Sequence, residues 1–485
     1  MTSQIANLLA AATDHLRAGR IEDAKRLYLR ILAMNVSHAP SLYGLGVIAR
    51  QAGNCEVAAS MMRRAIAADA NAAEYHFGLG DALQAAGRRD EALAAFHEAL
   101  RLDPPGILAR FRLGNLLQLE GRLDEAVAEY DRILQFKPDS VDAEFNIGNV
   151  FRLQGRLAEA RERYHRALTI QPGNVDALWN LSLLDLLEGD YAAGWPRYEV
   201  RHRRQVHGLR HFDQPQWKGE PLKGARILLH AEQGLGDTLQ FLRYVPMVAQ
   251  AGGQVLLDVP RSICRLAAEL ASVSAVIPTG ESLPEFDWQC PLMSLPAAFG
   301  TTVETVPALV PYLFVPAGAQ RCAKEPAWPQ SGLRVGLVWG AVPRQFEDSD
   351  RSVPLAALDL LLQIEGAHFF SLQLGPPAGQ LDRRAGRIID LRDAIHDFAD
   401  TAALASHLDL VITVDTSVAH LAAALAIPTW VLLPFSADWR WLVGRDDSPW
   451  YPSVRLFRQP RPNDWNAVVQ RISQDLALLA TMHRR

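Results

Sequence analysis

Small and apolar residues recur every 34 positions in the first part of the chain. Each period contains two stretches with the hydrophobic spacing of helices. The first ends near the glycine of a turn such as GRLDEA, and the second closes before a proline, as in YDRILQFKP. The pattern predicts an array of helical hairpins. Its registers are Gly46, Gly80, Gly114 and Gly148; Gly19, Gly53, Gly87, Gly121, Gly155 and Gly189; Ala24, Ala58, Ala92, Ala126 and Ala160; and Pro104, Pro138 and Pro172.

Residue size along this period predicts how the hairpins pack. Gly80 and Ala92 let two helices approach closely, whereas Phe96, Tyr130 and Leu134 fill the space between neighbouring hairpins. The period and the small-residue positions resemble the tetratricopeptide repeat over residues 6–204. This resemblance implies a helical solenoid whose groove binds a peptide or a partner protein. An array that serves only as a spacer or as a dimerisation element, giving a possible homodimer, is the alternative.

The last repeat departs from the pattern. Ser182 stands at the glycine position, and the following sequence YAAGWPRYEVRHRR is aromatic and basic. Because a terminal repeat must finish a stack, we expect this segment to be a capping helix against the next domain. The predicted array with its cap covers residues 1–204, and a connector covers residues 205–225.

From Gly219 the period changes to alternating strands and helices. A short apolar run, a glycine-rich turn, an amphipathic stretch and a second apolar run predict a βαβ unit and hence a parallel sheet. Further strands are predicted at LRVGLVWGA, AHFFSLQLG, GRIIDL, LDLVITVDT and IPTWVLLPF. The stretch 315–332 is rich in Pro, Ala and Gly and indicates a linker. We therefore expect two Rossmann-like halves, residues 226–325 and 326–485, that face each other across a cleft.

Two segments that follow predicted strands carry the candidate chemistry, because ligands of such sheets bind beyond the carboxyl ends of the strands. In EQGLGDT, two glycines let the backbone approach a ligand and Asp237 begins a helix facing the cleft; alternatively, Asp237 is only a helix N-cap. In VDTSVAH, Thr416 and Ser417 begin a helix that suits a diphosphate, and His420 adds a donor. The alternative is that Asp415 and Thr416 merely cap the helix and His420 is a core residue.

Three segments resemble the lipopolysaccharide heptosyltransferases, the ninth glycosyltransferase family, over residues 226–460. They are ILLHAEQGLGDTLQFLRYVP, VGLVWGAVPRQFEDSDRSVPLAAL and LDLVITVDTSVAHLAAALAIPTWVLL. The resemblance implies the GT-B fold of two facing Rossmann domains, and an inverting, metal-independent transfer of a hexosyl or heptosyl group from a nucleotide-diphosphate sugar. It implies that Asp237 is the catalytic base. Arg351 matches the family's basic residue, with Arg344 as a second candidate for binding the diphosphate.

The sequence departs from this family at several positions. Ser417 replaces a glycine, Val353 replaces a tryptophan, and the last loop, PFSADWRWLVGRDDSPWYPSVRLFRQ, is aromatic and basic. Its rings either stack on a base or sugar or form a packed cover over the sheet. The predicted substrate-binding residues are Gln233, Gly234, Gly236, Trp339, Gly340, Arg344, Arg351, Asp415, Thr416, Ser417, His420, Trp439 and Arg440; no bound metal and no cofactor are expected.

The order of the parts, repeats followed by a two-domain transferase, is also that of the protein O-linked N-acetylglucosamine transferases. It suggests a protein or peptide acceptor presented by the array. The alternative is a non-catalytic repeat scaffold with a degenerate nucleotide-binding module. An oxidoreductase is disfavoured because the third glycine of a dinucleotide fingerprint is missing.

Composition narrows the class of partner. The net charge is only −5, without the basic excess typical of nucleic-acid binders, so no nucleic acid is expected as a partner. Four scattered cysteines predict neither a disulfide framework nor a zinc site. The first residues lack a basic signal region, and the apolar stretch 408–433 is interrupted by Asp409, Asp415, His420 and Pro428. We therefore expect no transmembrane segment and a cytoplasmic location.

Overall fold

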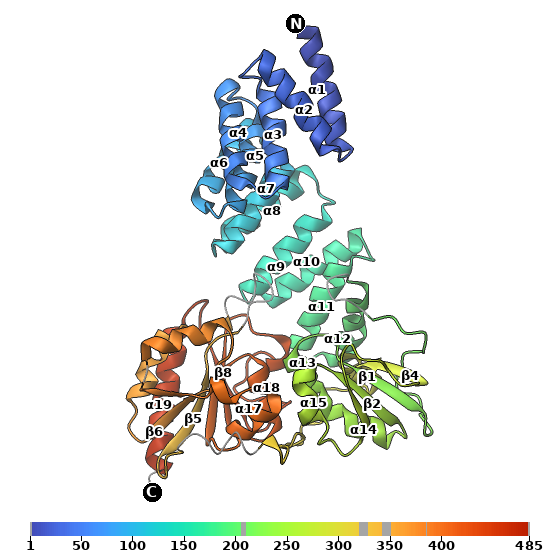
Figure 1. Cartoon of the computed structure of the whole chain (residues 1–485), viewed down its shortest axis with the longest axis vertical. Coiled ribbons are helices and arrows are strands. Elements are labelled where there is room, and N and C mark those ends of the chain that lie inside the picture. Colours follow the sequence, from blue (N-terminus) through green and yellow to red (C-terminus); the bar gives the residue numbers. More distant parts are fainter. Residues whose placement is uncertain (1, 205–209, 320–327, 342–350, 385, 484–485) are drawn as a thin grey trace. The chain divides into compact units, whose positions relative to one another are not determined.

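The chain forms two compact units, Met1–Asn174 and Val175–Arg485 (Figure 1). The structure is a computed structural model that describes residues 2–204, 210–319, 328–341, 351–384 and 386–483. The predicted connector and linker lie partly outside these residues.

The first unit is a helical array. Its helices pair into successive antiparallel hairpins, and neighbouring hairpins stack, as the 34-residue period predicts. Glycines with positive φ, such as Gly87 (76°) and Gly121 (73°), follow the first helix of a hairpin and allow the tight turn. The prediction of a tetratricopeptide-type solenoid is confirmed. The helices are α1 (Thr2–Arg17), α2 (Ile21–Met34), α3 (Ala39–Gln51), α4 (Cys55–Ala68), α5 (Ala73–Ala85), α6 (Arg89–Leu102), α7 (Ile107–Leu119), α8 (Leu123–Phe136), α9 (Val141–Leu153) and α10 (Leu157–Ile170).

Close packing within a hairpin depends on glycine facing an aromatic ring. A Cβ atom added at Gly80 on α5 would lie 2.6 Å from Cε1 of Phe96 on α6. The ring has little freedom to move, because Phe96 is fully buried and packs against Phe77 with 6.0 Å between ring centroids. The same arrangement recurs one period later, where Gly114 faces Tyr130. Phe96 and Tyr130 therefore pack inside their own hairpins, and not between neighbouring hairpins as the sequence predicted.

We expect Gly80→Ala to lower the free energy of unfolding of the first unit. Overpacking costs about 1–3 kcal/mol and outweighs the roughly 1 kcal/mol that alanine gains in helix propensity, so the net loss is about 1 kcal/mol. Urea unfolding followed by far-ultraviolet circular dichroism measures it. The double variant Gly80→Ala/Phe96→Leu is the control, since shortening the ring makes room for the new methyl group. Simple additivity of the two single effects would contradict this explanation.

The second unit begins with helices that belong to the repeat pattern in sequence but pack with the sheets. They are α11 (Val175–Leu187), α12 (Tyr191–Tyr198) and the 3₁₀ turn η1 (Glu199–Arg203). On α12, Trp195 donates its indole N–H to the carbonyl of Thr301 (3.0 Å), and the Tyr191 hydroxyl accepts from the Trp450 indole (2.9 Å). These buried contacts are those expected of a helix that covers the following domain.

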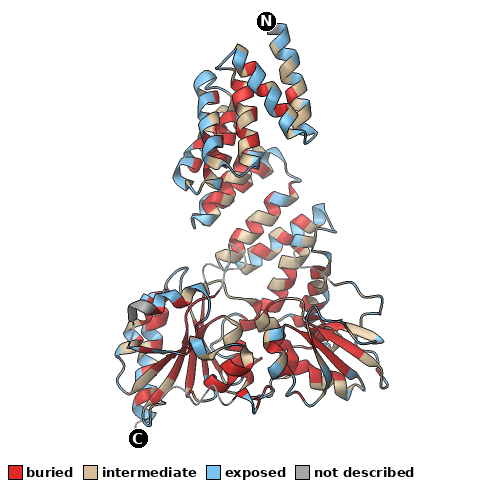
Figure 2. Ribbon diagram, viewed as in Figure 1, coloured by how far each residue is buried: buried red, intermediate tan, exposed pale blue. Residues whose placement is uncertain are grey.

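Two parallel sheets form the body of the second unit. The first has the order β3-β2-β1-β4 and the second the order β10-β9-β8-β5-β6-β7. Strand β8 is buried along its whole length, as expected of a strand covered on both faces (Figure 2). The strands are β1 (Arg226–His230), β2 (Gln254–Val259), β3 (Val273–Pro278), β4 (Trp288–Pro291), β5 (Leu333–Val338), β6 (Ala367–Ser371), β7 (Ile388–Asp390), β8 (Leu410–Val414), β9 (Thr429–Leu433) and β10 (Val454–Arg458).

The prediction of a parallel α/β region is confirmed, and β3, β4 and β10 are additions to it. β10 lies inside the aromatic segment that sequence reasoning treated as a loop. Within the part of the chain that is described, no helix is long and apolar enough to cross a bilayer. The remaining α-helices of this unit are α13 (Leu235–Phe241), α14 (Val245–Gln250), α15 (Arg261–Ala267), α16 (Leu295–Ala298), α17 (Phe398–Ala405), α18 (Ser417–Ala424) and α19 (Trp465–His483).

Candidate functional site

A cavity of about 360 Å³ lies in the second unit, beyond the carboxyl ends of β1, β5, β6 and β8. Its volume falls within the range of small-molecule sites, about 300–1,000 Å³. Both sheets contribute, because the loop after β1 belongs to the first sheet and the other loops belong to the second. The lining residues are Gly234, Leu235, Gly236, Asp237, Val338, Gly340, Ala341, Arg351, Leu372, Gln373, Leu374, Gly375, Phe398, Thr401, Asp415, Thr416, Ser417, Val418, His420, Asp438 and Arg440.

Asp237 lies in the cavity wall at the start of α13. Its Oδ2 accepts a hydrogen bond from the backbone N–H of Gly234 (2.7 Å), and Gly234, not Asp237, occupies the N-cap position. Asp237 is therefore not the N-cap residue. The helix begins at Leu235, and Asp237 is its third residue. The other carboxylate oxygen, Oδ1, accepts from Arg440. Asp237 is thus held at both oxygens by donors from two different loops.

Arg440 is a buried cation between two carboxylates. Its Nη1 donates to Asp438 Oδ1 (2.8 Å), its Nη2 to Asp237 and its Nε to Gln240 Oε1 (2.8 Å). Burial alone would lower the pKa of Arg440, but Asp438 and Asp237 raise it well above its usual value. The guanidinium, 4.3 Å from the centroid of the Trp439 ring, therefore remains charged at the cavity wall.

The loop after β8 brings a second set of polar groups to the cavity. Thr416 is the N-cap residue of α18 but makes no side-chain capping bond, so its predicted capping role is not seen. Its Oγ1 lies 3.1 Å from Oγ1 of Thr413. Backbone N–H groups at the start of α18 are donors suited to an anion. The segment therefore offers hydroxyls and main-chain donors to the cavity, next to the loop after β1.

Asp415 is almost fully buried in this loop, with 6% of its surface exposed. Burial, followed by the negative charge of Asp438, raises the pKa of Asp415 to about 6, whereas Arg351 and Arg440 act in the opposite direction. The carboxyl group therefore changes charge in the weakly acidic range, not near pH 4.

We expect this shift to make the second unit less stable as the pH rises from about 4 to about 6. The folded chain binds the Asp415 proton more tightly than the unfolded chain, so the stabilisation is complete below pH 4 and is lost as the pH passes 6. Asp415→Asn should raise the free energy of unfolding at pH 8, on the order of 2–3 kcal/mol, and leave it nearly unchanged at pH 4. Urea unfolding at both pH values, followed by tryptophan fluorescence, measures the difference. An equal effect at the two pH values would contradict it.

His420 is packed as a buried residue, and it also lines the cavity. Its Nδ1 lies 2.9 Å from the Tyr451 hydroxyl, and its ring stacks on Trp441 with 5.5 Å between centroids. Burial lowers the pKa of His420 well below its usual value, so the imidazole is neutral near pH 7. A Cβ atom at Gly236 would lie 2.9 Å from His420 Cδ2, so a glycine there allows the close contact of α13 with α18.

The structure places ten of the predicted residues together at the cavity, and three elsewhere. Trp339 is buried in the core of the second sheet, and Gln233 contacts the Tyr198 hydroxyl. Trp439 packs edge-to-face against Trp195 and Trp450. Arg344 lies outside the described residues. The ten are Gly234, Gly236, Asp237, Gly340, Arg351, Asp415, Thr416, Ser417, His420 and Arg440.

The rings of the aromatic loop are buried against one another and against α12. Trp441, Trp450 and Tyr451 are fully buried, and Trp439 is 3% exposed. This favours the packed-cover interpretation of the loop over stacking on a ligand. Two polar residues of the same segment, Asp438 and Arg440, line the cavity.

Sequence reasoning missed Gln373 and Asp438. Gln373 Oε1 accepts from the backbone N–H groups of Trp339 (3.0 Å) and Gly340 (2.8 Å), and its amide donates to the carbonyls of Gly340 and Leu374. It therefore shapes the loop after β5. A polar residue directly after an apolar strand, as in FFSLQLG, is the signal that could have identified it.

Comparison with known proteins agrees with both parts of this description. Tetratricopeptide-repeat family models match residues 9–73, 43–107 and 77–141, and a further TPR model matches 148–184. The glycosyltransferase family 9 (heptosyltransferase) model matches residues 396–440, which include Asp415, His420, Asp438 and Arg440.

One curated relative is protein FlbA of Caulobacter vibrioides, 26% identical over 313 residues. The match covers 58% of this chain and 52% of FlbA, so the chain spans about half the length of this relative. Similar solved structures include YrrB, described as a TPR protein with an unusual peptide-binding site (26% identity, TM-score 0.33, 36% of this chain and 89% of that one). Another is PilF of Pseudomonas aeruginosa (18%, TM-score 0.38, 42% and 93%).

The repeat models fall on the first unit and α11, and the transferase model covers the loops after β8 and β9, which supply part of the cavity lining. The chain therefore carries tetratricopeptide repeats followed by a segment of the glycosyltransferase family 9 (heptosyltransferase) type.

Proposed function

We propose that this chain is an inverting glycosyltransferase that takes its sugar from a nucleotide-diphosphate donor bound in the cavity. The observation that carries the proposal is the meeting of Asp237 with Arg440 and Arg351 in one cavity formed by both sheets. Together with the family 9 match to residues 396–440, this arrangement supports a GT-B-type pair of Rossmann domains. Which sugar is transferred is left open between hexosyl and heptosyl donors.

The positive groups have the chemistry that a diphosphate leaving group requires. Negative charge develops on the phosphate oxygens as the glycosidic bond breaks, and buried donors stabilise it strongly. Arg440 remains charged, and Arg351 and the start of α18 lie on the same cavity. These groups provide charge stabilisation without a bound metal ion. The apolar part of the lining, Leu372, Leu374, Phe398 and Val418, would receive the nucleoside.

Asp237 is the candidate base for the acceptor hydroxyl. Inversion requires a carboxylate on the face of the sugar opposite the leaving group. Asp237 comes from the first sheet, whereas the candidate phosphate donors come from the second, and Arg440 is the donor that contacts Asp237 directly. The repeat array of the first unit would bind a protein acceptor or a partner protein.

A panel of nucleotide sugars tests the proposal. The full chain is incubated with each donor and a cell extract, and release of the nucleoside diphosphate is followed with and without EDTA. We expect release with at least one donor, and no loss on adding EDTA. Failure of every donor to be bound or hydrolysed would contradict the proposal, and loss of activity with EDTA would contradict metal independence.

A second candidate is a non-catalytic scaffold that binds a nucleotide. It is favoured by the departures at Ser417 and Val353, and by the engagement of both Asp237 oxygens by Gly234 and Arg440. Tight nucleotide binding without transfer to any component of the extract would support this candidate against the enzyme.

A further inference from the structure

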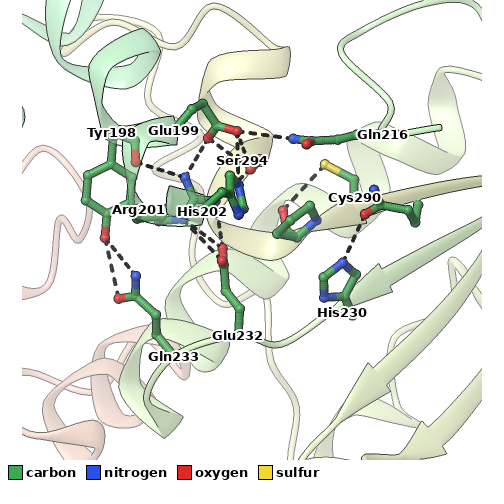
Figure 3. Close-up of polar contacts among 12 residues, drawn as sticks. Tyr198, Glu199, Arg201, His202, Gln216, His230, Glu232, Gln233, Cys290 and Ser294 are labelled. Carbon is green, nitrogen blue, oxygen red and sulfur yellow. Dashed lines mark hydrogen bonds and ion pairs between the residues drawn. The ribbon is translucent and has the colours of Figure 1, made fainter. Parts of the chain in front are cut away.

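A buried cluster of charged side chains lies beside the loop that carries Asp237, and none of its members lines the cavity (Figure 3). Arg201 on η1 is only 2% exposed. Its Nη1 donates to Glu199 Oε1 (2.6 Å), and its Nη2 donates to Glu232 Oε1 (2.7 Å) and to Ser294 Oγ (2.6 Å). One guanidinium thus joins two carboxylates and a hydroxyl from three separate segments.

Glu199 and Arg201 stay ionised near neutral pH, since the pKa of Glu199 is lowered and that of Arg201 is raised. Burial alone would raise the pKa of Glu199, but the hydrogen bond with His202 and the charge of Arg201 lower it to about 2. Removing these charges from water costs free energy that the ion pairs recover only in part. The cluster therefore contributes little net stability to the fold. We infer its role from the groups that it holds in place.

One of these groups is the start of the loop after β1. Glu232 accepts hydrogen bonds from both Nε (3.1 Å) and Nη2 (2.7 Å) of Arg201. The next residue, Gln233, contacts the Tyr198 hydroxyl with its side-chain amide (3.3 Å). Gly234 then donates its backbone N–H to Asp237. The end of α12 and η1 therefore hold the loop immediately before the residue proposed as the base.

Tyr198, the last residue of α12, also contacts the segment that carries Arg440. The Tyr198 ring lies edge-to-face with Trp439, with 6.1 Å between centroids, and the Arg201 guanidinium lies 4.9 Å from the Tyr198 centroid. Trp439 immediately precedes Arg440, the partner of Asp237. Tyr198 and Arg201 together thus hold both the loop that carries Asp237 and the segment that carries Arg440.

We propose that Arg201 is a positioning residue, which holds the loop Glu232–Asp237 so that Asp237 is aligned for the transfer reaction. This inference rests on the proposed function. Tyr198 and Arg201 belong to the segment that follows α11, and α11 overlaps the repeat match at 148–184. The chain that follows the last repeat therefore also shapes the catalytic loop.

The test replaces the ion cluster by neutral groups, Arg201→Met/Glu232→Met/Glu199→Gln, so that neither carboxylate paired with Arg201 is left without its partner. Such exchanges of a whole ion cluster often preserve the fold. The matched control is Arg226→Met/Glu285→Met, an exposed ion pair at the opposite end of β1. Hydrogen exchange of the backbone amides of residues 233–240 is followed in the full chain, together with kcat and the KM for the donor. Arg201→Lys serves as the conservative variant.

We expect faster exchange in this loop and a fall in kcat of about 10- to 100-fold, since a displacement near 1 Å can have this effect. The donor KM should stay within about twofold, Arg201→Lys should recover part of kcat, and the control should behave as the unmodified chain. Unchanged exchange in the triple variant would overturn the inference, as would an equal change in the control. If the unmodified chain transfers no sugar, the proposed function fails, and the exchange result still decides whether Arg201 holds the loop.

Discussion

Asp237→Asn is expected to reduce sugar transfer by about 10²- to 10⁴-fold, the usual contribution of a general base. Asparagine has nearly the same shape, and its amide oxygen can still accept the Gly234 N–H that Asp237 accepts at 2.7 Å. Its NH2 group then faces Arg440 and cannot accept the hydrogen bond that Oδ1 of Asp237 accepts. Asparagine cannot take a proton from the acceptor hydroxyl. The loss should therefore appear in kcat, with little change in binding of the nucleoside diphosphate, as measured by steady-state kinetics and calorimetry.

Asp438→Asn is the matched control for this prediction. Asp438 is the other carboxylate that contacts Arg440, at 2.8 Å, and it lines the same cavity. This control separates the loss of a negative charge beside Arg440 from the loss of the base. We expect Asp438→Asn to reduce sugar transfer by about tenfold or less. Full activity of Asp237→Asn, or equal losses in the two variants, would remove Asp237 from the role of base.

Arg440→Met is expected to lower the free energy of unfolding of the second unit by about 3–5 kcal/mol, because it leaves two carboxylates beside each other without their buried partner. The carboxylates are those of Asp237 and Asp438, and Gln240 also loses its donor. Affinity for a nucleoside diphosphate should fall as well, by about 10- to 100-fold, since a charged hydrogen bond contributes about 1.5–3 kcal/mol.

Urea unfolding followed by tryptophan fluorescence measures this loss without interference from the repeats. All 11 tryptophans of the chain lie after residue 175, so their emission reports on the second unit. The control is Arg445→Met in the same segment, whose ion pair with Asp447 is largely exposed and should contribute no more than about 1 kcal/mol. Similar losses in the two variants would show that Arg440 is not a buried link between the two loops.

The repeat array was predictable because its packing is local. Contacts such as Gly80 with Phe96 join residues of one hairpin, so the period of small and large residues contains the information. The strand-end rule likewise predicted that Asp237 and the segment Asp415–His420 each follow the carboxyl end of a parallel strand. They belong to different sheets, so their meeting was expected only because the two predicted halves face each other across a cleft.

Other parts depend on contacts between distant segments, which no local pattern contains. Trp439 was expected at the ligand but packs on Trp195 of α12, 244 positions earlier in the chain. Asp438 received no role, because its significance arises from Arg440 and Asp415 around it. Gln373 was missed since its effect is on the backbone of another loop.

The placement of α11 and α12 with the sheets has a consequence for how such a chain can change over evolutionary time. Duplication or deletion of a whole 34-residue hairpin before Asn174 would alter the number of repeats while preserving the helices that contact Thr301 and Trp450. The length of the array can therefore vary in steps of one hairpin, independently of the residues that line the cavity.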